Sequence, residues 1–184
     1  AANFRQHYLI RRILVEGQPC VLGGPKKSLK TSLLVDLAFS LGTGTPFLNC
    51  SDFSVPAPVN VMMLSGESGR FTLQETARRV ALARGRLLST ARIFWGFTLP
   101  QLGEPAHLAE LTKQIREHDI KAAIVDPAYL CLLAADTNSN ISDIWDLNGN
   151  HWHYNYAQAT QLGVLACSGF NRPSLTSAGN YETI

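Results

Sequence analysis

A segment rich in glycine and lysine near the start of the chain constrains its fold more than any other feature. Residues 24–31 read G-P-K-K-S-L-K-T and follow the P-loop pattern G-x-x-x-x-G-K-[ST], except that Leu29 occupies the position of the second glycine. A P-loop binds phosphate where a strand ends and a helix begins, because its backbone N–H groups and the helix N-terminus face the same anion. The segment therefore predicts a strand before it and a helix after it.

The residues on either side of this segment fit that prediction. Residues 19–22 are a short apolar run that leads into two glycines, as expected for a buried strand that turns sharply. After the loop, leucine and alanine recur at helical spacing from Leu33 to Leu41, and Gly42 and Gly44 are expected to end the helix. The alternative is a surface turn between two core elements.

Each residue type in the loop has a chemical use in binding a nucleotide. Lys30 would reach the β- and γ-phosphates, and the Thr31 hydroxyl would bind Mg²⁺, a hard cation that takes oxygen ligands. Leu29 is expected to turn its side chain toward the core while its N–H faces phosphate. The residues predicted to bind ATP are Gly24, Pro25, Lys26, Lys27, Ser28, Leu29, Lys30, Thr31 and Ser32.

The composition indicates one globular domain. With 184 residues, 46% of them hydrophobic, the chain can form one α/β core and is too apolar for a disordered tail. We expect a single domain over residues 1–184, with residues 1–17 as a lead-in and residues 173–184 as an irregular tail. Because no apolar run is long enough for a membrane span and no signal peptide is apparent, we expect a cytoplasmic protein without a membrane partner.

Apolar strand-like runs alternate with helical patterns along the chain. This alternation predicts an α/β fold with a mostly parallel sheet and helices on both faces. The expected strands after the loop are residues 59–65, 93–97, 120–125 and 163–167. The expected helical faces carry first Leu73, Ala77, Val80 and Ala81, and then Leu108, Leu111 and Ile115.

Two acidic residues follow buried strands, where open α/β sheets place their ligands. Asp126 ends the apolar run of residues 120–125, a Walker B pattern in which the carboxylate holds Mg²⁺ through water. Glu67 follows residues 59–65 between two glycines and could orient and deprotonate an attacking water. Each has a structural alternative, since Asp126 could cap its strand and Glu67 could cap the next helix. The three strand ends together favour nucleotide binding.

Four motifs together resemble one family of nucleotide-binding proteins. They are G-G-P-K-K-S-L-K-T-S around the loop, L-S-G-E-S-G around Glu67, E-T-A-R-R-V, and I-V-D-P-A-Y-L-C-L-L around Asp126. The combination resembles the RepA-like branch of AAA-type, RecA-fold P-loop ATPases, which lies near hexameric replicative helicases and KaiC-type ATPases. The resemblance covers residues 14–172, and some members of the branch also carry K-K-S-L-K-T.

The resemblance implies roles for individual residues. Lys30 and Thr31 become the phosphate and magnesium ligands, Glu67 the catalytic carboxylate, and Asp126 the Walker B acid at the metal. Ser168, on the strand after Walker B, stands at the polar sensor position, so Lys30, Glu67 and Ser168 are the expected catalytic residues. RecA-type domains usually add further strands after this one, so we expect a RecA-like fold that is truncated at its C-terminal end. The implied partners are further copies in a homo-oligomer such as a ring, single-stranded DNA and replication proteins.

Three functions remain open on the sequence alone. The first is an Mg-dependent ATPase that acts in DNA replication or recombination, as helicases do. The second is a non-motor regulatory module that binds nucleotide with weak or no hydrolysis. The third is a P-loop kinase of small molecules, for which no acceptor pocket can be identified.

The remaining polar features are assigned structural roles. A net charge of +2 is too small to indicate nucleic-acid binding by itself. His151 and His153 have no nearby acidic or cysteine ligand and are expected to be exposed rather than to bind a metal. The four cysteines lie far apart and are expected to be reduced core thiols. The arginines expected on a solvated helix surface are Arg78, Arg79, Arg84 and Arg86.

Overall fold

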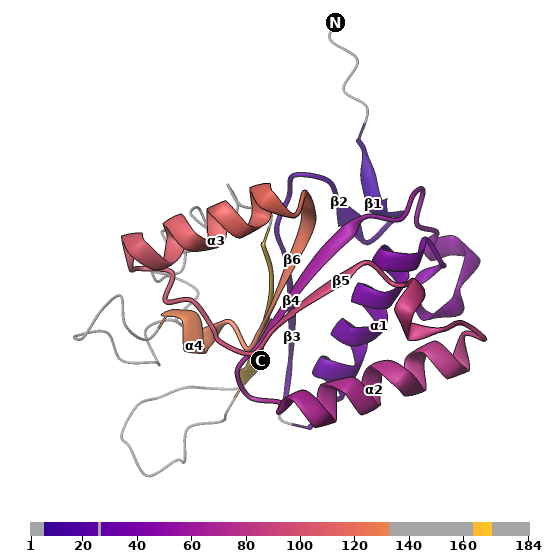
Figure 1. Ribbon diagram of the computed structural model, residues 1–184. Coiled ribbons are helices and arrows are strands. Elements are labelled where there is room, and N and C mark those ends of the chain that lie inside the picture. The colour runs from indigo at the N-terminus through magenta and orange to yellow at the C-terminus, as the bar shows by residue number, and fades with distance from the viewer. Residues whose placement is uncertain (1–5, 26, 133–163, 171–184) are drawn as a thin grey trace, which may run out of the picture.

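The chain folds around a parallel sheet that is flanked by helices (Figure 1). The computed structural model describes residues 6–25, 27–132 and 164–170. The strands are β1 (Tyr8–Ile10), β2 (Leu14–Val15), β3 (Cys20–Pro25), β4 (Asn60–Ser65), β5 (Ile93–Gly96), β6 (Ile120–Asp126) and β7 (Val164–Phe170). The α-helices are α1 (Lys30–Thr43), α2 (Arg70–Ala83), α3 (Pro105–Glu117) and α4 (Tyr129–Leu132), and short 3₁₀ helices span Phe47–Asn49, Ser51–Phe53 and Leu88–Thr90.

The five strands β3 to β7 form one sheet in the order β3-β7-β6-β4-β5, and each neighbouring pair is parallel. The mostly parallel sheet that the sequence predicts is therefore confirmed. Because the strands run the same way, the carboxyl ends of β3, β4 and β6 meet along one edge of the sheet, at the bottom of Figure 1. In this register Ser65 of β4 lies opposite Asp126 of β6, and Gly23 of β3 lies opposite Ser168 of β7.

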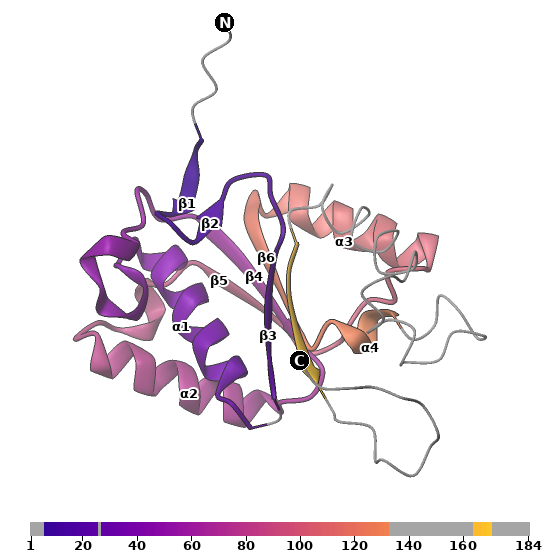
Figure 2. The same ribbon diagram turned by 180° about the vertical axis from the view of Figure 1, so that it is seen from behind.

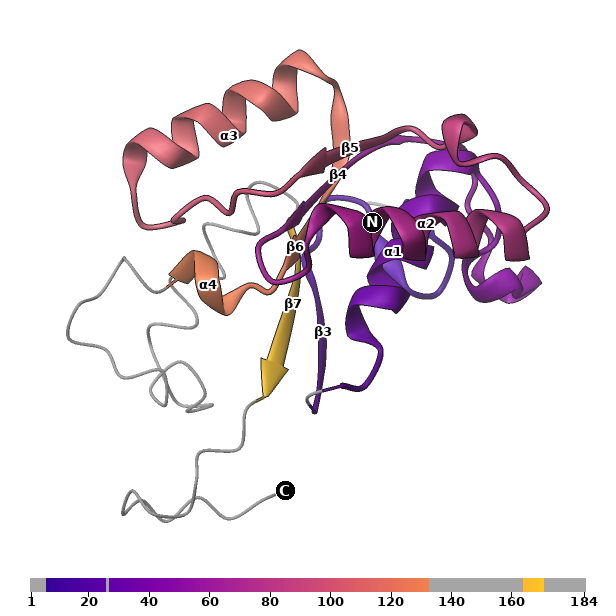
Figure 3. The same cartoon turned by 60° about the horizontal axis from the view of Figure 1, so that its bottom comes forward.

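Helices cover both faces of the sheet, as the alternation predicts. Helices α1 and α2 lie on one face and α3 on the other, an arrangement visible from front and back (Figures 1 and 2). Figure 3 shows the same separation from below, with α4 on the side of α3. Side chains of β4 point alternately to the two faces of the sheet, because successive residues of a strand face opposite directions. Val61 and Met63 pack with α1 and α2, whereas Met62 and Leu64 pack with residues of α3.

Residues 8–15 form more than the lead-in expected from the sequence. Strands β1 and β2 pair as a small antiparallel sheet. Its residues Ile10 and Leu14 are buried in the same core cluster as α1, and Arg11 N donates a 2.9 Å hydrogen bond to Ser54 O. Strands of three and two residues are too short for an alternating pattern to reveal them.

One expectation about local structure is confirmed in part and another is wrong. Gly44 ends α1 as its C-cap, with φ 75°, but Gly42 lies inside the helix, which continues to Thr43. Gly42 instead permits close packing, because a Cβ atom there would lie only 2.9 Å from Arg92 N. Arg84 does not lie on a solvated surface, since it is buried in an ion pair with Asp36. Sequence spacing on α2 could not reveal a partner on another helix.

The cysteines were expected to be reduced core thiols. Cys20, Cys50 and Cys131 are free thiols, and of these only Cys131 is fully buried. Lys26, the pair His151 and His153, and the tail of residues 173–184 lie outside the described residues. Within the described ranges, no helix is both long and apolar enough to cross a membrane.

Candidate functional site

The predicted phosphate-binding loop joins β3 to α1. Strand β3 continues through both glycines to Pro25, so strand, loop and helix follow one another in the order that the pattern predicts. Leu29 is the N-cap of α1 and makes no side-chain hydrogen bond to the first turn. The first N–H groups of a helix have no partner inside the helix, so an uncapped N-terminus can offer them to an anion.

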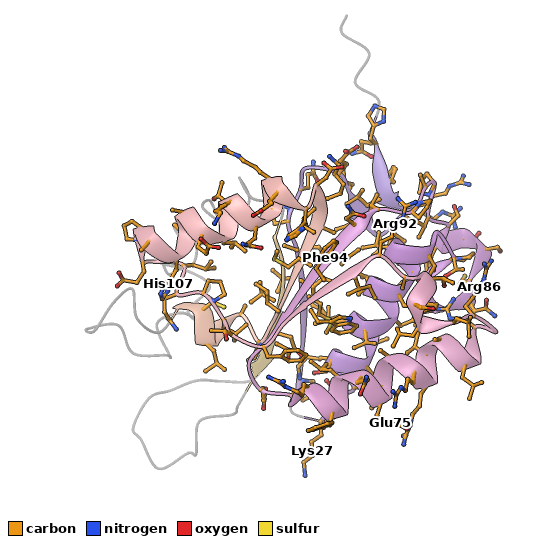
Figure 4. The ribbon with its side chains drawn as sticks, viewed as in Figure 1. Lys27, Glu75, Arg86, Arg92, Phe94 and His107 are labelled. Carbon is orange, nitrogen blue, oxygen red and sulfur yellow. The ribbon has the colours of Figure 1, made fainter. Side chains whose placement is uncertain are left out.

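Leu29 has a backbone conformation that explains why glycine is usual at this position. Its φ of 62° and ψ of 19° lie in the left-handed region, where a Cβ atom is unfavourable. Its side chain is 72% exposed, so the expectation that it turns toward the core is wrong. Lys27 also has a positive φ, 63°, and extends into solvent (Figure 4).

Lys30 curls its side chain back over the loop that precedes it. Its Nζ donates to the carbonyl oxygens of Gly24 at 3.0 Å and Pro25 at 2.6 Å, and lies 3.5 Å from Ser28 Oγ. Ser28 Oγ in turn donates to Pro25 O at 2.7 Å. A Cβ atom on Gly24 would lie 2.9 Å from Ser28 Oγ, so a larger residue at position 24 would displace the Ser28 hydroxyl from its bond to Pro25. The ammonium group thus lies within the loop, where a bound phosphate would meet it.

Thr31 and Asp126 are in direct contact. Thr31 Oγ1, in the first turn of α1, donates a 2.7 Å hydrogen bond to Asp126 Oδ2 at the carboxyl end of β6. Asp126 is only 3% exposed. Strand β7 lies between β3 and β6, so this bond joins the loop to a strand that is not its neighbour in the sheet. The two residues predicted to hold Mg²⁺ are therefore brought together, and Asp126 does more than cap its own strand.

Ser65 lies beside Asp126 at this edge of the sheet and was not among the residues predicted from the sequence. It ends β4, is 1% exposed, and lies opposite Asp126 in the register of the two strands. Gly66 N bonds to Asp126 O at 3.0 Å, which fixes the strands together at this point. The Ser65 hydroxyl has no hydrogen-bond partner in the described structure. Its only signal in the sequence is a polar residue at the end of an apolar strand, and its significance depends on strand pairing.

Glu67 lies on the loop between β4 and α2 and is exposed. It makes no hydrogen bond or ion pair within the described ranges. The N-cap of α2 is Gly69, and no side chain caps that helix. The alternative role of Glu67 as a helix cap is therefore wrong. The loop starts at Ser65, so Glu67 belongs to the same edge of the sheet as Asp126.

The remaining predicted residues lie around the loop. Ser32 is half-buried in the first turn of α1. Ser168 belongs to β7, which lies between β3 and β6 in the sheet. This is the strand after Asp126 on which the sequence predicted Ser168. Lys26, within the loop, is outside the residues described.

The donor atoms at this edge fit magnesium. Mg²⁺ prefers oxygen ligands, keeps several waters, and usually takes one or two carboxylates together with substrate phosphates. The Thr31 hydroxyl and the Asp126 carboxylate are such donors, and the unpartnered Ser65 hydroxyl lies on the neighbouring strand. Among the described residues, no group of three His, Cys, Asp or Glu side chains could hold a metal ion by itself.

Comparison with known proteins places the chain in a family. A family model described as an AAA domain matches residues 4–166, which includes the loop, Glu67 and Asp126. No curated protein matches the chain.

Proposed function

Because this chain belongs to the AAA domain family, whose members are P-loop ATPase-type domains, we propose that it binds ATP with Mg²⁺ and hydrolyses it. The observation that carries this proposal is the 2.7 Å hydrogen bond from Thr31 to Asp126. It joins the helix that follows the loop to the strand that ends in Asp126, so the two residues proposed to hold Mg²⁺ lie together. The uncapped N-terminus of α1 and the ammonium group of Lys30 support the same assignment.

The phosphates would bind where the N-terminus of α1 and the Lys30 ammonium both supply positive charge. The free N–H groups at the start of α1 and the Lys30 ammonium would receive the β- and γ-phosphate oxygens. Thr31 and Asp126 would hold Mg²⁺, Thr31 through its hydroxyl and Asp126 through water. When bound, the ion neutralises charge on the phosphates.

Hydrolysis would depend on Glu67. Its carboxylate is exposed and unpaired within the described part of the chain, so it is available to accept a proton from a water molecule. In this role Glu67 orients the water for in-line attack on the γ-phosphate and removes its proton. Ser168 on β7 would donate a hydrogen bond near the same phosphate.

The cellular role proposed here rests on the motif resemblance. The loop, the Glu67 segment and the Asp126 segment are similar to those of the RepA-like branch of RecA-fold ATPases. We therefore propose a homo-oligomeric ATPase that works with single-stranded DNA and replication or recombination proteins, as helicases do.

A binding titration tests the nucleotide site. The probe is a fluorescent, non-hydrolysable ATP analogue, titrated with and without Mg²⁺. The protein should bind it and bind it more tightly with Mg²⁺, whereas Lys30→Ala should lose binding and Thr31→Ala should lose the gain from Mg²⁺. Lys113→Ala is the matched control, because Lys113 is an exposed lysine on α3. A wild-type protein that binds no analogue would overturn the proposal.

Turnover assays separate the functions that binding alone leaves open. Phosphate release that single-stranded DNA accelerates supports the proposed motor. Tight binding with negligible turnover supports the regulatory module instead, and transfer of the γ-phosphate to an added acceptor supports a kinase.

A further inference from the structure

The hydroxyl of Ser65 is a buried polar group whose purpose the fold does not explain. It is 1% exposed and has no hydrogen-bond partner in the described structure. A buried hydroxyl without a partner loses its hydrogen bonds to water and gains none in return, so it destabilises the folded protein. Such groups are rare in folded proteins, and each calls for an explanation such as a bound water or ion.

The strand register shows where this hydroxyl lies. Along β4, Val61 and Met63 belong to the core cluster beneath α1, and Ser65 continues the same alternation. Along β6, Ala122 and Ile124 belong to that cluster, and Asp126 continues it. Ser65 and Asp126 are opposite one another in the register and so share the α1 face of the sheet. The bond from Thr31 to Asp126 independently places the start of α1 on that face.

We propose that Ser65 is a positioning residue that binds a water ligand of the magnesium ion, beside the water held by Asp126. The inference rests on the proposed function and assigns a residue of the same site. Mg²⁺ keeps several of its waters when it binds. A polarised water in that shell would be a hydrogen-bonding partner for the Ser65 hydroxyl, for which the described residues supply none.

The test is the substitution Ser65→Ala, which removes one oxygen atom and leaves the packing nearly unchanged. Two quantities are measured: the melting temperature of the metal-free protein, and the Mg²⁺ concentration that half-saturates binding of the fluorescent, non-hydrolysable ATP analogue. Ser65→Ala should leave the melting temperature the same or higher, because it removes an unpartnered group. It should raise the half-saturating Mg²⁺ concentration about three- to tenfold, the factor expected for one lost hydrogen bond.

Ser40→Ala is the matched control. Ser40 is a fully buried serine on α1, but its Oγ bonds to Pro46 O at 3.5 Å. Its substitution should lower the melting temperature and leave the Mg²⁺ dependence unchanged. The two serine variants should therefore show opposite patterns.

The outcomes distinguish this inference from the proposed function. If the wild-type protein shows no Mg²⁺-dependent binding of the analogue, the proposed function fails and the inference fails with it. If wild-type binding depends on Mg²⁺ and Ser65→Ala has the same half-saturating concentration, only the inference is wrong. A metal-free Ser65→Ala protein that melts several degrees lower also overturns it, because the hydroxyl would then serve the fold.

Discussion

Arg84, at the end of α2, forms an ion pair with Asp36, in the middle of α1, in which one guanidinium nitrogen contacts both carboxylate oxygens. Arg84 Nη2 lies 2.6 Å from Asp36 Oδ1 and 2.7 Å from Oδ2, and both side chains are almost completely buried. Arg84 Nη1 donates to Pro46 O at 2.6 Å, and Leu48 N donates to Asp36 Oδ2 at 2.9 Å. Through these two bonds, the ion pair also fixes the backbone at Pro46 and Leu48, which follow α1 in the chain. Because α1 starts at Lys30 and Thr31, this network fixes the helix that carries the residues proposed to bind phosphate and Mg²⁺.

Removing one partner of this pair should destabilise the protein strongly. Arg84→Ala leaves the Asp36 charge buried without its counter-ion, which typically costs about 3–5 kcal/mol. The free energy of unfolding in urea should fall by that amount. The double variant Asp36→Ala with Arg84→Ala should lose less than the sum of the single variants. Arg79→Ala, which breaks the exposed pair with Glu75, should cost at most about 1 kcal/mol and serves as control.

Leu29→Gly should stabilise the protein. Leucine in a left-handed conformation costs about 1–2 kcal/mol, and glycine recovers most of this, less the entropy of a more flexible unfolded chain. We expect a net gain of about 0.5–1 kcal/mol in urea unfolding.

The matched control for that change is Leu87→Gly. Leu87 is also 72% exposed, but its φ is −83°, a value that leucine adopts readily. Glycine there should lower stability by about 0.4–1 kcal/mol. If both substitutions destabilise equally, backbone strain at Leu29 is not significant.

Glu67→Gln should separate binding from hydrolysis. The amide keeps the size of the side chain but cannot remove a proton from water, so the rate of phosphate release should fall about 10²- to 10⁴-fold. Affinity for the ATP analogue should stay within about twofold, since Glu67 makes no hydrogen bond or ion pair to the loop within the described part of the chain. Glu75→Gln, an exposed glutamate on α2, should change neither quantity. Unchanged turnover in Glu67→Gln would remove Glu67 from the mechanism.

Cys131 should make the protein less stable at alkaline pH. Burial raises the pKa of its thiol from 9.0 to about 12. Below pH 9 the thiol is neutral in both folded and unfolded chains and contributes no pH dependence. As the pH rises from 9 toward 12, only the unfolded chain ionises, so stability falls by about 1.4 kcal/mol per pH unit for this group.

The measurement is urea unfolding at a series of pH values between 8 and 10.5, compared with Cys131→Ala. The alanine variant lacks the titrating thiol, so its stability should fall less steeply above pH 9. Equal slopes in the two proteins would show that Cys131 does not ionise on unfolding.

The fold was largely predictable because its strands and helices have clear local patterns. Apart from Asn60 and Lys121 near their starts, the runs that lead to Ser65 and Asp126 are apolar, as buried parallel strands require, and their shared direction brings both carboxyl ends to one edge. The loop from β3 to α1 was likewise marked by residue type and spacing. These signals depend on neighbours in the chain, which a sequence displays directly.

The features that sequence reasoning missed depend on contacts between distant residues. Gly42 resembles a helix end until the close approach of Arg92 is known. Arg84 resembles a surface residue until Asp36, on another helix, is placed beside it. Ser65 gains its significance only from the register that sets it opposite Asp126. None of these contacts follows a regular period.

In the proposed nucleotide site, Lys30 would exchange its bonds to Gly24 and Pro25 for bonds to the ligand. An arriving anion must displace two carbonyl oxygens from the ammonium group, so the affinity due to Lys30 is the difference between the old and the new partners. A weakly charged anion gains little from that replacement, whereas a polyphosphate, with its several charged oxygens, gains much. Because opening these bonds costs the same for every anion, the closed lysine would lower the affinity of the proposed site for all anions alike, and only a ligand with several charged oxygens would gain enough to bind well.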